Sequence, residues 1–204
     1  MGSRRAVVKK SAFGIIIFFR QVDYICQMLD SLDFFNQVKN VFTREELPAR
    51  SLLIKERTLP KKLFFIETGC CRCWFDSDDG KEITINFGFE NMFVSSLETI
   101  ISGELSWYSI ETLEPTVAYS ISISDFKAMK STIPEVQAYY IEYVEKRLMA
   151  YQKLFVSRIK DSPEKRYREL ITEYPEIIRR VPQHYIASFL GITSVSLSSI
   201  RNRK

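Results

Sequence analysis

The stretch KKLFFIETGCCRCWFDSDDGKEITINFG, residues 61–88, decides the class of fold. It contains three short runs rich in β-branched and aromatic residues, which favour β-strands. Asp79-Gly80 separates the last two runs and suits a tight hairpin, because glycine adopts a positive φ at little cost. Similar runs lie on both sides, so we predict a β-sandwich or small barrel over about residues 50–125. The expected strands are 51–56, 61–69, 70–75, 81–88 and 117–124.

The N-terminal part of the chain is expected to be helical and buried. Val22, Ile25, Leu29 and Leu32 follow helical spacing, which predicts a helix over residues 22–45. The apolar run at 12–19 is too short to span a bilayer and is not followed by a small-residue cleavage site. We therefore interpret it as a buried segment and expect no membrane partner; residues 1–20 have no further assigned role.

A long helix is predicted after the β-rich region. Thr132, Pro134 and Glu135 suit a helix start from about residue 131. Apolar residues then recur at steps of three and four, as along a coiled-coil seam. They are Ile141, Val144, Leu148, Tyr151 and Phe155. We predict dimerisation along residues 136–155, with an ordinary core helix as the alternative.

Charge is unevenly distributed along the chain. Residues 61–125 carry 4 lysines and arginines and 11 aspartates and glutamates, a net charge of −7. Residues 153–204 carry 11 and 5, a net charge of +6. A basic C-terminal quarter indicates a polyanionic partner for that part of the protein.

The four cysteines, Cys26, Cys70, Cys71 and Cys73, do not have the spacing of a disulfide framework. A metal or redox cluster would need further ligands, and the only histidine, His184, is more than a hundred residues away. We therefore interpret the three clustered cysteines as small apolar strand residues and expect no metal and no cofactor. Reduced thiols indicate a cytoplasmic protein.

The C-terminal region is predicted to end in two helices joined by a tight bend. Ser162, Pro163 and Glu164 first start a short helix that reaches about Ile171. Further on, Ala187 is small enough for two helices to cross closely, and Gly191 suits the bend. Inward positions fall at Ile186, Leu190, Ile192, Leu197 and Ile200. This is the helix-turn-helix pattern, for which a plain helical hairpin remains the alternative.

The helix-turn-helix reading assigns candidate DNA contacts. Thr193 can cap the second helix, and the side chains after it would face base edges. Arginines and a lysine nearby would hold phosphates. The expected base-facing residues are Ser194, Val195, Ser196 and Ser199, and the expected phosphate contacts are Arg201, Arg203, Lys204, Arg179 and Arg180.

The order of these parts resembles the Crp/Fnr family of bacterial transcription regulators from about residue 47 to the end. KKLFFIETGCCRCW and GKEITINF resemble that family's β-roll, and IASFLGITSVSLSSIR resembles its DNA-reading motif. The resemblance implies an α+β fold with three parts: a jelly-roll-type β-roll resembling a cyclic-nucleotide-binding domain (1–130), a long dimerisation helix (131–160) and a C-terminal helical helix-turn-helix domain (161–204). It also implies a homodimer on palindromic double-stranded DNA, with RNA polymerase as a further partner.

The chain departs from the family at the positions that bind a cyclic nucleotide. Leu105 stands where those members carry the arginine for the cyclic phosphate, and Ser95 stands at the glutamate position; Ser106 matches. Without the guanidinium a buried phosphate lacks its bidentate partner, so we expect an altered ligand or none. Tyr151 and Gln152 occupy the base-contacting positions of the long helix. Any small-molecule effector is expected near Ser95, Leu105, Ser106, Tyr151 and Gln152.

Two other classes of function remain. One is a small-molecule-binding module whose C-terminal hairpin contacts proteins, for which DNA binding would be absent. The other is a jelly-roll enzyme, which would need clustered histidine and carboxylate ligands that a chain with one histidine does not supply. We therefore expect a regulator and not an enzyme.

Overall fold

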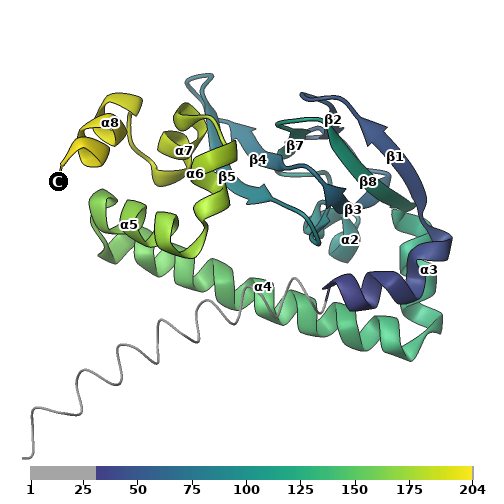
Figure 1. Cartoon of the computed structure of the whole chain (residues 1–204). Coiled ribbons are helices and arrows are strands. Elements are labelled where there is room, and N and C mark those ends of the chain that lie inside the picture. The colour runs from purple at the N-terminus through teal and green to yellow at the C-terminus, as the bar shows by residue number, and fades with distance from the viewer. Residues whose placement is uncertain (1–30, 204) are drawn as a thin grey trace, which may run out of the picture.

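The computed structural model describes residues 31–203. Two four-stranded antiparallel sheets face each other, with strand orders β1-β8-β3-β6 and β2-β7-β4-β5 (Figure 1). The expected β-roll is therefore present. Its strands are β1 (Thr43–Leu47), β2 (Leu52–Ile54), β3 (Lys62–Thr68), β4 (Cys71–Asp76), β5 (Glu82–Gly88), β6 (Phe93–Val94), β7 (Ser109–Thr112) and β8 (Thr116–Ser122).

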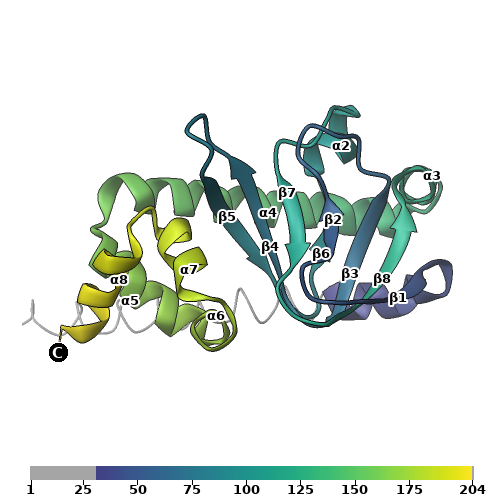
Figure 2. The same cartoon turned by 90° about the horizontal axis from the view of Figure 1, so that it is seen from above.

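Helices cover one side of the β-roll and form the C-terminal part of the chain. Figure 2 shows α4 running the length of the molecule, past the sheets at one end and the C-terminal helices at the other. Residues 31–38 are helical. The other helices are η1 (Lys39–Val41), α2 (Leu97–Ser102), α3 (Ile123–Thr132), α4 (Pro134–Lys160), α5 (Pro163–Glu173), α6 (Pro175–Arg180), α7 (Gln183–Leu190) and α8 (Ser194–Asn202). We refer to α5–α8 as the C-terminal helical region.

Strand β3 is buried on both faces. Phe64 and Ile66 belong to the core between the two sheets. Leu63 and Phe65 belong to a second core under the helix of residues 31–38, α3 and α4. Successive strand residues point to opposite faces, so a strand covered on both sides needs a continuous apolar run. This explains the sequence LFFI at the centre of the opening stretch.

The helix predicted over residues 22–45 ends earlier than expected. Residues 31–38 are helical, and the chain then passes through η1 into strand β1 at Thr43. Strand β1 pairs with β8 from Thr43 opposite Ser120 to Leu47 opposite Thr116. This sheet pairing overrides the helical preference of the sequence TREEL. Residues 22–30 lie outside the described residues, as does the apolar run at 12–19 that is expected to be buried.

The strand predicted over residues 117–124 is confirmed as β8, which runs from Thr116 to Ser122. Helix α3 follows at once, because the Ser122 hydroxyl accepts a hydrogen bond from the Asp125 amide at 2.9 Å and caps its N-terminus. Thr132, expected at the start of the long helix, is the last residue of α3, and α4 begins at Pro134. All five predicted strands are confirmed to within two residues at each end, whereas β1, β6, β7, α2, α3 and α6 were not predicted.

Gly69 and Gly80 offer a matched pair of substitutions. Both have a positive φ, but an added Cβ would lie 2.3 Å from Thr116 Oγ1 at Gly69 and would meet nothing within 4 Å at Gly80. We expect Gly69→Ala to lower the free energy of unfolding by about 2–3 kcal/mol, because overpacking adds to backbone strain. Gly80→Ala is expected to cost about 1 kcal/mol, from strain alone. Urea denaturation of both variants tests this, and equal losses would contradict the close approach of Gly69 to β8.

Candidate functional site

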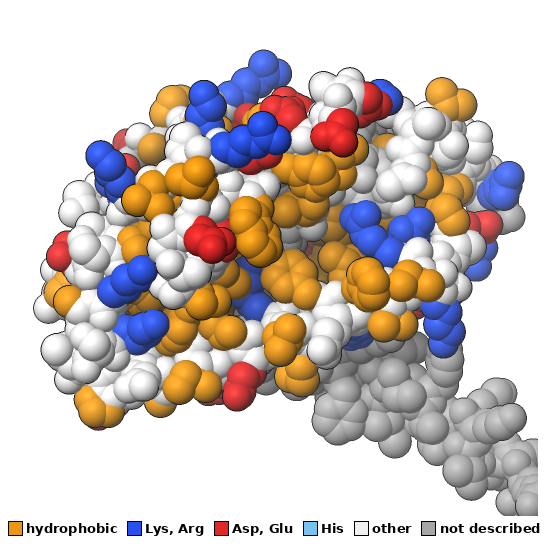
Figure 3. Space-filling model, turned by 180° about the vertical axis from the view of Figure 1, so that it is seen from behind, with side chains coloured by type: hydrophobic (Ala, Val, Ile, Leu, Met, Phe, Trp, Pro, Cys, Tyr) orange, Lys and Arg blue, Asp and Glu red, His pale blue; other side chains and the backbone are white. Residues whose placement is uncertain are grey.

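A cavity of about 240 Å³ lies between the β-roll, α4 and the C-terminal helical region. The face of the molecule seen in Figure 3 is hollowed, with hydrophobic side chains gathered around the hollow. The β-roll contributes Phe87, Phe89, Phe93 and Ile110 to the cavity wall, among others. On the opposite side the wall consists of residues from α4 (Tyr143, Arg147, Ala150, Tyr151 and Leu154), α5 (Leu170), α6 (Ile177) and α7 (Phe189), with Tyr174 between α5 and α6.

The structure separates the five residues expected around an effector. Ser95 and Tyr151 line the cavity, whereas Leu105, Ser106 and Gln152 are not among its lining residues. Leu105 is 52% exposed, and Gln152 is also exposed. Ser106 is buried, and its hydroxyl donates to the carbonyl oxygen of Tyr108 at 2.7 Å. The Leu105-Ser106 pair therefore does not form part of this cavity.

Arg147 is the charged side chain of the cavity, and it was not predicted from the sequence as a site residue. Its Nη1 donates to the Tyr143 hydroxyl at 3.0 Å and its Nη2 to the Tyr151 hydroxyl at 2.6 Å. These tyrosines lie four residues before and after it, where side chains on one helix face meet. Burial opposes the charge, but the two phenols nearby hold the pKa of Arg147 above its ordinary value. The guanidinium is therefore charged and fixed in position.

The three clustered cysteines are buried, as expected for small apolar strand residues. Cys70 and Cys71 are fully buried, and Cys73 is 8% exposed. Burial raises the pKa of Cys70 and of Cys73 to about 12, and it raises that of Cys71 as well. Such thiols stay protonated and are poor nucleophiles at neutral pH. Cys26 lies outside the described residues.

Within residues 31–203, His, Cys, Asp and Glu side chains do not come together in any group of three or more that could hold a metal ion. In the same part of the chain, none of the helices combines the length and apolar character needed to cross a membrane.

Helix α4 presents an apolar stripe to solvent. Ile141, Leu148 and Phe155 are 48%, 57% and 65% exposed, and Tyr151 is 39% exposed. Val144 is half-buried. The opposite side of the helix packs on the β-roll, where Val136 is buried and Tyr143 donates to the carbonyl oxygen of Phe93 at 3.0 Å. Ile141, Leu148 and Phe155 of the predicted seam therefore form a surface stripe, whereas Tyr151 also lines the cavity.

The two C-terminal helices and their tight turn are where the sequence predicts them. Gly191 ends α7 in the left-handed region with φ of 67°. The Thr193 hydroxyl accepts from the Ser196 amide at 3.1 Å and caps α8. The inward positions Ile186, Ala187, Leu190 and Leu197 are buried, and Ile192 and Ile200 pack against the same core.

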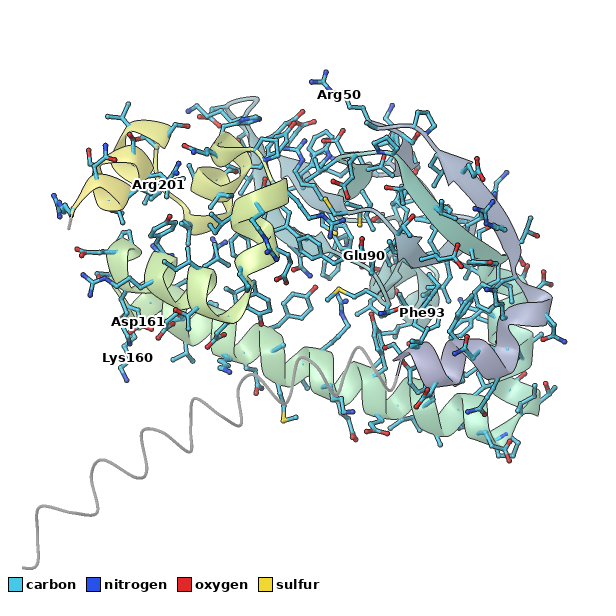
Figure 4. All side chains as sticks on the ribbon, in the orientation of Figure 1. Arg50, Glu90, Phe93, Lys160, Asp161 and Arg201 are labelled. Carbon is cyan, nitrogen blue, oxygen red and sulfur yellow. The ribbon has the colours of Figure 1, made fainter. Side chains whose placement is uncertain are left out.

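The outer face of α8 is exposed, and all but one of its side chains are polar. Val195 is 76% exposed, and Ser194, Ser196 and Ser199 are exposed beside it. Arg201, labelled in Figure 4, and Arg203 are exposed at the C-terminal end of the helix. Arg203 lies 3.8 Å from the carboxylate of Glu164 on α5. Lys204 lies outside the described residues.

The two arginines at the end of α6 have different surroundings. Arg179 is exposed. Arg180 donates to both carboxylate oxygens of Glu90, at 2.9 and 2.7 Å, and also to Glu114. Figure 4 shows Glu90 where the β-roll meets the C-terminal helical region. Arg180 was expected to hold a phosphate, but its charge is already paired with two carboxylates of the β-roll.

Further contacts fix α7 against strand β5, the edge of the second sheet. The Ser188 hydroxyl accepts from the Thr84 amide at 2.9 Å and donates to the carbonyl oxygen of Glu82 at 3.2 Å. The guanidinium of the buried Arg72 lies 3.7 Å from the centre of the Tyr185 ring. Phe87 and Phe89 of the β-roll join the core of the C-terminal helical region. The two parts are therefore packed together through an apolar core with polar contacts around it.

The chain is similar to a known domain family and to several solved structures. Residues 44–132 match the cyclic nucleotide-binding domain family. No curated protein matches the chain.

Among solved structures, the chain is similar to CLP of Xanthomonas campestris, which is described as a c-di-GMP-responsive global regulator. The two sequences are 14% identical, the similarity covers 81% of this chain and 87% of CLP, and the TM-score is 0.66. The chain is also similar to FixK2 of Bradyrhizobium japonicum, with 15% identity, coverage of 80% and 84%, and a TM-score of 0.66. A protein of Eubacterium rectale assigned to the crp/fnr family has 17% identity, coverage of 79% and 77%, and a TM-score of 0.65. Residues 44–132 are thus similar to this domain family, and the fold of the chain, a β-roll followed by a helical C-terminal region, is like that of these solved structures.

Proposed function

We propose that the protein is a homodimeric, DNA-binding transcription regulator of the Crp/Fnr type. The observation that carries the proposal is the order of parts in one chain: a cyclic-nucleotide-binding β-roll, a long helix with an exposed apolar stripe, and two helices joined at Gly191. The fold likeness to regulators such as CLP extends over about four-fifths of the chain, which supports a common arrangement of these parts.

The exposed face of α8 supplies the proposed DNA-reading surface. Ser194, Ser196 and Ser199 offer hydroxyls that donate to or accept from base edges, and Val195 suits a thymine methyl group. Arg201 and Arg203 lie one turn further along the chain and bind phosphates, with Lys204 and Arg179 as further phosphate contacts. Two such helices in a dimer would read half-sites about 34–36 Å apart, one turn of DNA.

The proposal predicts a palindrome and a steep dependence on salt. Selection from random duplexes is expected to enrich two inverted half-sites, and affinity for the selected duplex should fall as salt rises because phosphate contacts release counterions. Sequence-blind binding with a flat salt response, or no binding, would contradict the proposal. The absence of DNA binding would favour a module whose C-terminal hairpin contacts proteins.

A pair of arginine variants separates phosphate contacts from general charge. Removing both Arg201 and Arg203 with alanine takes two phosphate contacts from each protomer, so the slope of log K against log salt should become shallower by about 4 in a dimer. Arg168→Ala is the matched control, because Arg168 is exposed on α5 and pairs with Glu164. An unchanged slope in the double variant would exclude α8 as the DNA-contacting end of the chain.

A further inference from the structure

We propose that the cavity beside Arg147 binds a small organic carboxylate, whose charged group pairs with the Arg147 guanidinium and whose apolar body lies among the cavity's aromatic side chains. The proposal concerns a binding site on the long helix. It does not use the Leu105-Ser106 pair, which lies outside the cavity lining.

The Arg147 guanidinium carries a positive charge without a counter-charge among the described residues. A guanidinium carries five N–H donors. Tyr143 and Tyr151 accept from Nη1 and Nη2, whereas Nε is buried and has no hydrogen-bond partner. Within residues 31–203, no carboxylate lies within ion-pair distance of Arg147. A charge taken out of water without a counter-charge is strongly unfavourable, so the site is suited to an anion.

The guanidinium of Arg147 is already oriented before any ligand binds. Tyr143 and Tyr151 hold it from the turns before and after, and Tyr143 is itself fixed by donating to the carbonyl oxygen of Phe93 at 3.0 Å. Carboxylates pair with arginine through two parallel N–H donors. A guanidinium that is already fixed loses less conformational entropy when it forms such a pair. Tyr143 and Tyr151 therefore hold Arg147 in an orientation that suits a planar anion.

The size and lining of the cavity suit a small ligand with an apolar body. Its volume of about 240 Å³ exceeds the roughly 150 Å³ of an apolar cavity that binds benzene, and it lies below the roughly 300–1,000 Å³ of sites for drug-sized ligands. Phe87, Phe89 and Phe93 line it from the β-roll, and Leu170 and Ile177 line it from the C-terminal helical region. A single ring or short alkyl chain with one carboxylate fits these limits.

The occupant would touch both halves of the molecule. Because α5, α6 and α7 contribute to the cavity wall, a bound acid contacts the C-terminal helical region as well as the β-roll. If the proposed function holds, such an acid is the effector, and DNA affinity should change when it binds. That second statement rests on the proposed function, whereas binding of the acid does not.

Calorimetric titration and thermal unfolding test the site without DNA. The probes are benzoate, phenylacetate and octanoate, with benzamide and phenylacetamide as neutral counterparts and cyclic AMP and inorganic phosphate as alternative anions. At least one carboxylate is expected to raise the melting temperature by about 5–10 °C at a hundred times its Kd, with its amide binding at least tenfold more weakly. No binding by any of the three acids at millimolar concentration, or equal binding of acid and amide, would overturn the proposal.

Variants locate the site. Arg147→Met is expected to abolish binding of the carboxylate, and Lys146→Met, which removes a neighbouring charge that pairs with Glu142, should leave it unchanged. Tyr151→Phe keeps the ring but removes one hydroxyl that orients the guanidinium. It should weaken binding about tenfold in a folded protein, and this result counts even if Arg147→Met does not fold.

Repeating the DNA titration with the bound acid separates the two proposals. Acid binding without any DNA binding would refute the proposed function alone. DNA binding without acid binding would refute this inference alone.

Discussion

Replacing both Leu148 and Phe155 with glutamate is expected to convert the proposed dimer to a monomer. The two side chains are 57% and 65% exposed on the apolar stripe of α4, so their substitution leaves the core of one protomer intact. In a dimer each would contribute about 1.5–3 kcal/mol of apolar burial in each protomer, and four carboxylates would face one another in their place. The dissociation constant should therefore rise by more than about 100-fold.

Sedimentation at micromolar concentration measures this effect directly. Lys153→Glu is the control, because residue 153 is exposed and lies neither three nor four residues from Leu148 or Phe155. It should stay dimeric and bind the selected palindrome, whereas the double variant should lose affinity for two half-sites but keep its melting temperature to within a few degrees. A monomeric wild-type protein would exclude α4 as a dimer interface.

Phe35→Ala is expected to destabilise the protein by about 3–5 kcal/mol, the usual cost of deleting a buried aromatic ring. Phe35 is 2% exposed, and its ring stacks on Phe65 of β3 at 3.9 Å between centroids. Phe42 lies edge-on at 5.4 Å and Tyr119 of β8 lies at 5.1 Å. Because the ring is surrounded by other rings held on a sheet, the remaining space cannot collapse easily.

Chemical denaturation of Phe35→Ala should show this loss, with a fall in melting temperature of about 10 °C or more. Trp107→Ala provides the comparison, because Trp107 is 69% exposed and an equally large change there should cost under about 0.5 kcal/mol. A loss below about 1 kcal/mol for Phe35→Ala would mean that the helix of residues 31–38 does not pack on β3 in solution.

The sequence predicted the helix ends that are set by a single residue and do not depend on pairing with a distant segment of the chain. Gly191, Thr193 and Ser162 mark helix ends by their own backbone or hydroxyl, and the structure has these ends where expected. Strand β1 was missed because TREEL becomes a strand only through its pairing with β8, which is distant in sequence. Helix α3 was missed because its cap, Ser122, follows a run that still alternates like a strand.

Some residues of the candidate sites could be predicted from helical spacing, whereas others are revealed only by the packing of distant segments. The stripe of α4 and the face of α8 follow helical spacing, so the sequence alone identified their residues. Arg147 could have been found from its place between Tyr143 and Tyr151 at four-residue spacing, but only the packing of α4 on the β-roll shows that this face borders a cavity. Arg180 was assigned from charge alone, and charge does not reveal that Glu90 and Glu114 lie opposite it.

The attachment of α7 to strand β5 has a consequence for the solubility of the β-roll. An open sheet edge offers unpaired amides and carbonyls on which another chain can add a strand and begin to aggregate. Ser188 occupies two such groups on β5, and the C-terminal helical region covers Phe87 and Phe89 beside them. We expect a fragment that stopped after α4 to expose the open edge of β5 together with Phe87 and Phe89, and therefore to self-associate. In the whole chain, the C-terminal helical region covers this edge of the β-roll.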